Sequence, residues 1–343
     1  MLQAALQQML EGRHLSREEA QTAMLEIMEG KVTPTMIAAF LIALRMKGET
    51  VEEVTGFAEA MREKMLTVSP QRRPLVDTCG TGGDKVKTFN ISTAAAFVAA
   101  GGGVAVAKHG NRAVSGVCGS ADVLEALGIQ INLAPQQIAD CIDEVGIGFM
   151  FAPGLHPAMK HAGPVRREMG VRTVFNLLGP LANPARAQAQ VLGVYAAEHT
   201  ESHARVLQNL GSEKALVVHG MDGLDEISIT GATKVSELRD GSIVTNTVFP
   251  EDFGIPAVSL EELRSGCNAQ ENAELLLGVL EGNPGPRRNA VLINAAAAFV
   301  AAGKADGLAE GMEMAAQSID SGGALNKVEE LRDYSQRVGS AQA

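Results

Sequence analysis

Residues 74–93 read PLVDTCGTGGDKVKTFNIST, and this stretch decides the fold class. The run 74–77 predicts a short strand, the glycines that follow predict a turn, and the alanine-rich sequence that begins near Ser92 predicts a helix. Short β-branched runs alternate with glycine turns and helices along the rest of the chain. Strands that alternate with helices predict an α/β domain with a mostly parallel central sheet.

The other elements expected in this domain follow from the same patterns. Further strands are expected at 104–107, 147–151, 189–195, 215–219 and 226–230, and helices at 122–127, 135–145 and 287–302. Residues 238–243, LRDGSI, predict a hairpin turn.

The chain before about Leu66 predicts helices only. Helix starts are marked by two capping boxes, Ser16 with Glu19 and Thr50 with Glu53, and by Thr33-Pro34, an N-cap followed by proline at the first helical position. Short helices joined by short turns predict a small bundle, followed by a linker at 69–74.

Composition limits the classes of partner. The 343 residues are 46% hydrophobic, which is enough for a sizeable core, and only 3% aromatic, with no tryptophan. The formal net charge of −11 repels phosphate backbones and anionic membranes. Because aromatic platforms for base stacking are also scarce, nucleic acid is not an expected partner.

The cysteines and the first residues indicate a compartment. The four cysteines, Cys79, Cys118, Cys141 and Cys267, form no CxxC pair, which is typical of reduced thiols in a cytosolic protein. Residues 1–15 predict an amphipathic helix rather than a signal peptide, because they lack a basic leader and an apolar core. No apolar run is long enough to span a bilayer. We therefore expect a cytoplasmic protein.

The glycine-rich loop has the composition of an anion site. Its glycines let the backbone approach a ligand closely, and the helix start presents free N–H groups and the positive end of the helix dipole. Hydroxyl and amide groups are added by Thr88, Asn90, Ser92 and Thr93. The alternative is a plain turn before an N-capped helix. The loop is not a P-loop, because Val86 precedes Lys87-Thr88, and not a dinucleotide fingerprint, because Lys85 replaces the third glycine.

A second polar loop is expected after the strand at 104–107. Residues 108–116 read KHGNRAVSG and bring two cations, an imidazole, an amide and a hydroxyl to a strand's carboxyl end, where open α/β sheets bind ligands. Residues 119–122 then begin another helix, which is a further N-terminal anion site. The alternative is a solvated loop, and for His109 alone that interpretation is better. The cluster as a whole favours function.

Carboxylates and an arginine complete the candidate set. Residues 219–226 read HGMDGLDE and place three carboxylates after a strand. Asp225 and Glu226 would face opposite sides of a strand, but in a turn they can converge on a cation. Magnesium prefers a few carboxylates, water and substrate phosphates. Arg166, at a helix start, can hold a carboxylate through two N–H groups or can instead pair with Glu168.

Six motifs occur in one order along the chain, at residues 80–84, 88–93, 108–112, 119–122, 175–184 and 222–226. Together they resemble the anthranilate phosphoribosyltransferase family of tryptophan biosynthesis, and the resemblance covers nearly the whole chain. It implies transfer of the phosphoribosyl group of phosphoribosyl pyrophosphate (PRPP) to the amine of anthranilate, with release of pyrophosphate. It also implies a fold similar to that of nucleoside phosphorylases, a homodimer that meets through its helical domain, and two Mg²⁺ ions per active site.

The family fold further implies discontinuous domains. Residues 1–68, joined by a later segment of about 160–185, would form a small helical domain. Residues 74–159 and 186–343 would form the large α/β domain that carries the PRPP site.

The resemblance also assigns roles to individual residues. PRPP contacts are expected from Gly80, Gly83, Asp84, Thr88, Asn90, Ile91, Ser92, Thr93, Lys108, His109, Gly110, Asn111, Arg112, Ala113, Val114, Ser115, Gly116 and Ser120. Anthranilate contacts are expected from Gly80, Asn111 and Arg166, and magnesium ligands from Ser92, Asp225 and Glu226. No covalent nucleophile is expected. Lys108 would offset charge on the leaving group, and His109 would line the pocket.

Two positions depart from the family pattern. Lys85 stands where many relatives have glycine, which bears on loop closure over pyrophosphate. Leu155 stands where relatives often carry histidine, which bears on one wall of the amine channel.

Two other functions stay open at this point. A pyrimidine nucleoside phosphorylase would share the fold and the glycine loop, but it needs phosphate as nucleophile and a nucleobase site. A catalytically silent relative that binds a phosphorylated ligand or nucleic acid is the second alternative. The pair Asp225-Glu226 and the cluster 108–112 favour the transferase.

Overall fold

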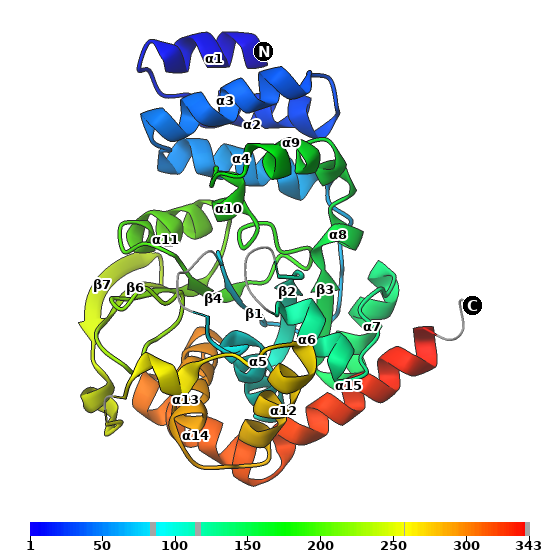
Figure 1. The fold of residues 1–343 in the computed structure, drawn as a ribbon, viewed down its shortest axis with the longest axis vertical. Coiled ribbons are helices and arrows are strands. Elements are labelled where there is room, and N and C mark those ends of the chain that lie inside the picture. Colours follow the sequence, from blue (N-terminus) through cyan, green and yellow to red (C-terminus); the bar gives the residue numbers. More distant parts are fainter. Residues whose placement is uncertain (83–86, 114–117, 257, 340–343) are drawn as a thin grey trace.

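The computed structural model describes residues 1–82, 87–113, 118–256 and 258–339. In this part of the chain one sheet has the order β3-β2-β1-β4-β5-β6-β7 (Figure 1). The strands are β1 (Leu75–Gly80), β2 (Ala105–Gly110), β3 (Ile147–Phe151), β4 (Ala189–Gly193), β5 (Lys214–Gly220), β6 (Thr233–Arg239) and β7 (Ser242–Val248). Neighbours from β3 to β5 are parallel, and β6 and β7 run antiparallel at one edge. The mostly parallel sheet is therefore confirmed.

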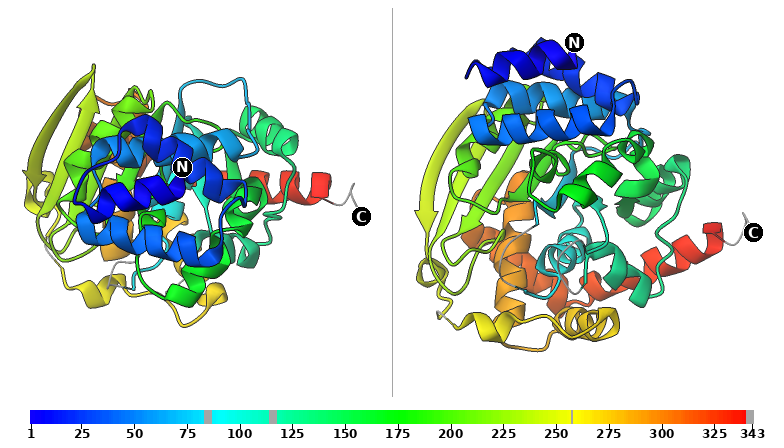
Figure 2. Two further views of the ribbon diagram at one scale, coloured as in Figure 1. Left: turned by 90° about the horizontal axis from the view of Figure 1, so that it is seen from above. Right: turned by 45° about the horizontal axis from the view of Figure 1, so that its top comes forward.

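The first helices of the chain form a bundle at one end of the molecule, and later helices cover both faces of the sheet (Figures 1 and 2). The α-helices are α1 (Leu2–Leu10), α2 (Arg17–Met28), α3 (Pro34–Lys47), α4 (Val51–Lys64), α5 (Ile91–Gly101), α6 (Ser120–Ala126), α7 (Pro135–Val145), α8 (Ala152–Leu155), α9 (Gly163–Met169), α10 (Phe175–Leu178), α11 (His199–Asn209), α12 (Ala269–Leu280), α13 (Pro286–Ala301), α14 (Leu308–Asp320) and α15 (Gly323–Gly339). Three short 3₁₀ helices are η1 (Pro157–Lys160), η2 (Pro250–Phe253) and η3 (Leu260–Leu263). Among the described residues, no helix is both long and apolar enough to cross a membrane.

The bundle helices begin where the sequence predicts. The Ser16 hydroxyl accepts a hydrogen bond from the Glu19 N–H at 3.2 Å, and the Glu19 carboxylate accepts one from the Ser16 N–H at 2.8 Å. Thr50 and Glu53 form the same reciprocal pair at the start of α4. Both capping boxes are therefore confirmed.

Alternate residues of β4 and β5 pack into two different cores. Leu192 and Val217 pack with the bundle and α11, whereas Val191 and Val218 face α5 and α13. The core on the bundle side also contains Ala162, Val165, Phe175, Leu178 and Leu181 from the segment after α8. This packing supports the proposal that the segment of about 160–185 joins residues 1–68 in one discontinuous unit.

Two local expectations were wrong. Residues 226–230 form no strand, because the Ser228 and Thr230 hydroxyls donate to the Asp222 carboxylate and the Ile227 N–H donates to the Asn294 side chain at 2.9 Å. These bonds curl the backbone and remove it from the sheet. Strand β2 also continues through Lys108, His109 and Gly110, which the sequence placed in a loop.

Helix α11 contains a buried histidine that predicts acid sensitivity. Burial lowers the pKa of His203 to about 3, whereas an unfolded histidine has a pKa of about 6.5. The unfolded state therefore binds more protons below about pH 6.5, and the free energy of unfolding falls as the pH drops toward 3. We expect His203→Leu to weaken this fall between pH 6.5 and 4.

Urea denaturation midpoints at pH 7 and pH 5 measure this effect. The exposed His14 provides a matched variant, His14→Gln, which is expected to retain the wild-type difference between the two midpoints. A His203→Leu protein with the same pH dependence as the wild type would contradict the prediction.

Candidate active site

Three segments meet at the carboxyl ends of β1 and β4. The Gly82 N–H donates to the Asp225 carboxylate at 2.9 Å, and the Ser92 N–H at the start of α5 donates to the Glu226 carboxylate at 3.2 Å. The glycine loop, the amino end of α5 and the loop with the paired carboxylates are therefore one structure. Asp225 and Glu226, which were expected to converge in a turn, each accept a backbone N–H from a different segment of this junction.

Two paired glycines make this convergence possible. Gly80 on β1 and Gly193 on β4 are partners in the sheet. A Cβ atom at Gly80 would overlap the Asp225 carboxylate, and a Cβ atom at Gly193 would overlap the Asp225 carbonyl oxygen. The backbone of Asp225 thus lies directly on the strand ends, and a side chain at Gly193 would displace it.

The paired carboxylates have the chemistry of a hard-cation site. Asp225 is half-buried, and loss of solvent raises the pKa of its carboxyl group. A cation would stabilise such a carboxylate in its charged form. In the described part of the chain no three His, Cys, Asp or Glu side chains group as a metal site. Two adjacent carboxylates have the donor chemistry of a hard cation such as Mg²⁺, which commonly takes its other ligands from substrate and water.

The start of α5 offers backbone groups more than side chains. Ile91 and Thr93 are 2% and 1% exposed, so their side chains belong to the core. The Asn90 side-chain nitrogen donates to the Cys118 carbonyl at 3.2 Å, and the Asn90 side-chain oxygen is buried without a partner among the described residues. Thr88 forms an isolated β-bridge with Arg264. The Ile91 N–H donates to the Phe89 carbonyl and the Ser92 N–H donates to Glu226, so the amino end of α5 would attract an anion through the positive end of its dipole.

Lys108 does not lie in an exposed loop. The residue is 3% exposed, and its ammonium group donates to the Thr78 carbonyl at 2.5 Å. Burial lowers the pKa of Lys108, and the nearby Asp77 carboxylate opposes this effect. Asp77 is fully buried and accepts from the His109 N–H at 3.0 Å and from the Asn183 side chain at 2.8 Å. The sequence missed this buried pair because it placed 108–110 outside the strand.

His109 packs against a second histidine. Its Nε2 atom lies 3.2 Å from Nε2 of His156, and each ring also hydrogen-bonds the backbone of the turn after α10, at Gly179 and Ala182 respectively. Burial lowers the pKa of His109 to about 3 and that of His156 to about 4. Both rings are therefore neutral at pH 7, and His109 supplies shape and hydrogen bonding rather than charge.

The rest of the second loop lies beside α6. The Arg112 guanidinium is paired with the carboxylates of Glu125 and Asp122 on α6, at 2.5 Å and 3.1 Å. The Asp122 carboxylate also accepts from the Ala113 N–H, and the Ser120 hydroxyl donates to the Asn111 carbonyl at 3.2 Å. At Gly110 a Cβ atom would overlap that same Ser120 hydroxyl. The predicted contacts Gly83, Asp84, Val114, Ser115 and Gly116 lie outside the described residues, as does Lys85.

Arg166 lies on α9. It is half-buried, and burial lowers the pKa of its guanidinium. The guanidinium carbon lies 5.1 Å from the centre of the Phe175 ring. The pairing of Arg166 with Glu168, considered from sequence, does not occur among the described ion pairs.

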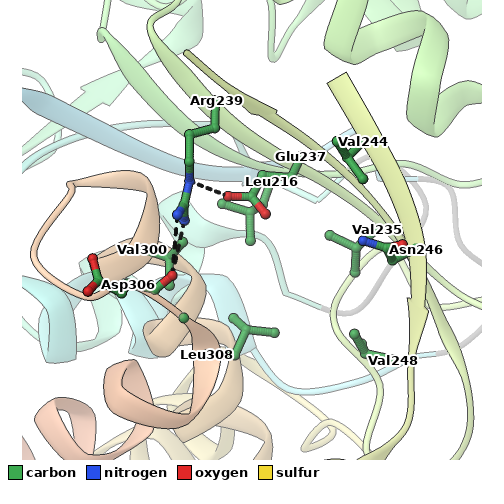
Figure 3. Close-up of a pocket in the computed structure, with 11 residues that line it drawn as sticks. Leu216, Val235, Glu237, Arg239, Val244, Asn246, Val248, Val300, Asp306 and Leu308 are labelled. Atoms are coloured by element: carbon green, nitrogen blue, oxygen red, sulfur yellow. Dashed lines mark hydrogen bonds and ion pairs between the residues drawn. The ribbon is translucent and has the colours of Figure 1, made fainter. Parts of the chain in front are cut away.

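A separate cavity lies at the antiparallel edge of the sheet. It has a volume of about 100 Å³ and is lined by residues of β5, β6 and β7 and of the turn after α13 (Figure 3). Arg239, its main cation, pairs with Glu237 at 2.7 Å and donates to the Asp306 carbonyl. Its polar groups are therefore largely used within the protein, and we assign the cavity no role in the site.

Comparisons with known proteins decide the family. Residues 3–65 match the helical bundle domain of the glycosyl transferase family, and residues 72–325 match its a/b domain. The anthranilate phosphoribosyltransferase of Symbiobacterium thermophilum is 56% identical over all of both chains.

This chain belongs to the anthranilate phosphoribosyltransferase family.

Solved structures of the family have the same fold over nearly their whole length. The crystal structure of anthranilate phosphoribosyltransferase from Thermus thermophilus matches with a TM-score of 0.91 and 44% identity, over 97% of this chain and 99% of that one. The Saccharomyces cerevisiae enzyme in complex with PRPP and Mg matches with a TM-score of 0.90 and 29% identity, over 98% of both chains. The resemblance inferred from the motifs, the fold class and the bundle are confirmed.

Sequence reasoning missed several residues that support the candidate site. Asp77 and Asn183 form a buried hydrogen bond, Gln190 donates to the Pro180 carbonyl, and Gly193 makes room for Asp225. The sequence could have indicated a supporting role for Asp77, because an acidic residue within an apolar strand needs a buried partner. The importance of Gly193 had no such signal, since it depends on a loop more than 30 residues away.

Proposed function

We propose that this protein transfers the phosphoribosyl group of PRPP to the amine of anthranilate, which yields N-(5-phosphoribosyl)anthranilate and pyrophosphate. The single observation that supports this most is the junction of the glycine loop, the amino end of α5 and the Asp225-Glu226 pair. The junction puts the positive end of the α5 dipole next to two carboxylates, which suits a magnesium-bound diphosphate. The named relatives support the choice of substrates.

The residues contribute mainly by binding and orientation. Substitution at the ribose carbon develops oxocarbenium-like charge, as in glycoside chemistry. The attacking aryl amine is neutral at pH 7, so no strong base is required, and the neutral pair His109–His156 agrees with this. The positive end of the α5 dipole attracts the diphosphate while Arg166 holds the amine's carboxylate. Such positioning contributes up to about 7–11 kcal/mol in ideal cases.

Magnesium would be held by Asp225, Glu226 and Ser92 in this proposal. The chemistry that it supplies when bound is neutralisation of charge on the leaving pyrophosphate. Mg is present in the Saccharomyces cerevisiae complex with PRPP. Two ions per site, as the family suggests, stay a prediction.

A direct assay tests this function. Anthranilate fluorescence is followed in the presence of the protein, PRPP and magnesium, and it should fall as anthranilate is consumed. Phosphorolysis of thymidine without magnesium would instead indicate a nucleoside phosphorylase. Loss of neither substrate would indicate a silent relative.

Arg166→Ala is expected to raise the anthranilate KM much more than the PRPP KM. The guanidinium offers a bidentate contact to the carboxylate of anthranilate and none to PRPP in this proposal. Steady-state kinetics with each substrate varied in turn give both values. Equal rises in the two KM values would count against the assigned role.

We also propose that the protein forms a homodimer through its bundle. Helices α1 and α3, which pack against each other, expose large apolar side chains, with Leu10 67%, Ile42 37% and Met46 83% exposed. Large exposed apolar side chains are a feature of protein–protein interfaces. This agrees with the interface that the family suggests.

A further inference from the structure

The Arg166 guanidinium is held by an aromatic ring rather than by an oxygen acceptor. Within the described residues, its only close partner is the ring of Phe175, and none of its N–H groups is used in a hydrogen bond or ion pair. A ring face attracts a cation through its quadrupole and uses no N–H donor. The guanidinium is therefore fixed in place while its donors stay available.

Other arginines of the bundle are held by oxygen acceptors. The Arg17 guanidinium is paired with Glu59, that of Arg45 donates to the Arg172 carbonyl, and that of Arg62 donates to the Leu181 carbonyl. Arg172 also lies over a ring, 4.7 Å from the centre of Tyr195, but it is exposed, whereas Arg166 is half-buried. The ring contact of Arg166 leaves its donors unused, which is what a carboxylate-binding residue requires.

Phe175 is itself fixed relative to the site. It is 4% exposed and packs in the core shared by the bundle and the sheet. It begins α10, and the turn that follows α10 hydrogen-bonds His109 through Gly179 and Asp77 through Asn183. The ring is therefore tied both to the bundle and to the strand ends beneath the second loop.

We propose that Phe175 is a positioning residue that holds Arg166 in the orientation needed for the substrate's carboxylate, and so sets the preference for carboxylated aromatic compounds. This inference rests on the proposed function, because it requires that Arg166 binds the carboxylate of the amine substrate. Phe175 does not touch the reacting atoms and acts only through Arg166.

The test uses Phe175→Leu and Phe175→Met in the full-length protein. Both keep an apolar side chain and remove the ring. We expect the anthranilate KM to rise roughly threefold to tenfold, as loss of a partly buried cation–π contact predicts, while the PRPP KM and kcat stay near wild type. Benzoate and aniline are then compared as competitive inhibitors. The benzoate Ki should rise in parallel with the anthranilate KM, and the aniline Ki should not.

A matched control separates this role from a purely structural one. Phe57→Leu makes the same substitution in the same core, where Phe57 is fully buried and its ring contacts Phe40, whereas the ring that contacts Arg166 is that of Phe175. Phe57→Leu should lower the stability of the protein and leave the ratio of the benzoate Ki to the aniline Ki unchanged. In an Arg166→Gln background, Phe175→Leu should add nothing further to the anthranilate KM.

Three results would overturn the inference. They are equal rises of the benzoate and aniline Ki values in both ring-removing variants, the same shift in Phe57→Leu, and full additivity with Arg166→Gln. A wild-type protein that consumes no anthranilate would refute the proposed function itself, and this outcome appears before any variant is made.

Discussion

Gly193→Ala is expected to lower kcat/KM more than about a hundredfold, because misplacing a site by about 1 Å costs on that order. The added Cβ atom would overlap the carbonyl oxygen of Asp225, and that oxygen belongs to backbone that cannot rotate away. The loop must therefore lift from the strand ends. When it lifts, Asp225 loses its bond from Gly82 and the carboxylate pair moves away from α5.

A second glycine provides the control for this variant. Gly231 follows the same loop, a Cβ atom added there would meet no other atom within 4 Å, and its φ angle is not positive. Gly231→Ala is expected to retain activity. Thermal unfolding of both variants shows whether the folds are intact. Wild-type turnover in a folded Gly193→Ala protein would contradict the placement of Asp225 over the strand ends.

Asp225→Asn combined with Glu226→Gln is expected to abolish turnover. Both changes are nearly isosteric, and they remove the two charges that would hold magnesium beside the diphosphate. Loss of one preorganised electrostatic contact lowers kcat by about 10²–10³-fold, and this variant removes two. The assay is anthranilate consumption across a magnesium titration.

The neighbouring carboxylate makes the matched control. Asp222 accepts bonds from Ser228 and Thr230 within its own loop, so its charge serves the loop's shape. Asp222→Asn is expected to cost some stability and to keep the magnesium dependence of the wild type. Wild-type magnesium dependence in the double variant would instead remove Asp225 and Glu226 from the site.

Local signals in the sequence were sufficient for most of the architecture. The capping boxes at Ser16 and Thr50 act within one helical turn, so their outcome depends on nearby residues alone. The helix 135–145 and the strand 147–151 were also predicted with the observed bounds. These elements combine a clear apolar period with a proline or glycine at an end.

Features that depend on distant residues were not predictable in this way. Residues 226–230 have the β-branched pattern of a strand, but Asp222 and Asn294 take their hydrogen bonds. The sequence pattern predicts Lys108 as a cation in a loop. In the structure it is buried near the Asp77 carboxylate, which lies about 30 positions earlier in the chain. The six motifs located the candidate site, whereas its supports on β1 and in the turn after α10 came only from the structure.

The core that joins the bundle to the sheet has a consequence for how the protein responds to a protease. Proteolysis between Val68 and Pro74 would cut one of the peptide connections between the helical bundle and the α/β domain. The segment after α8 packs with α1 to α4 and would still join the two. The nicked fragments would remain associated through Leu178, Leu192 and their neighbours. Cleavage there would leave an active protein made of two associated fragments. Two bands on a denaturing gel would therefore not by themselves mean loss of activity.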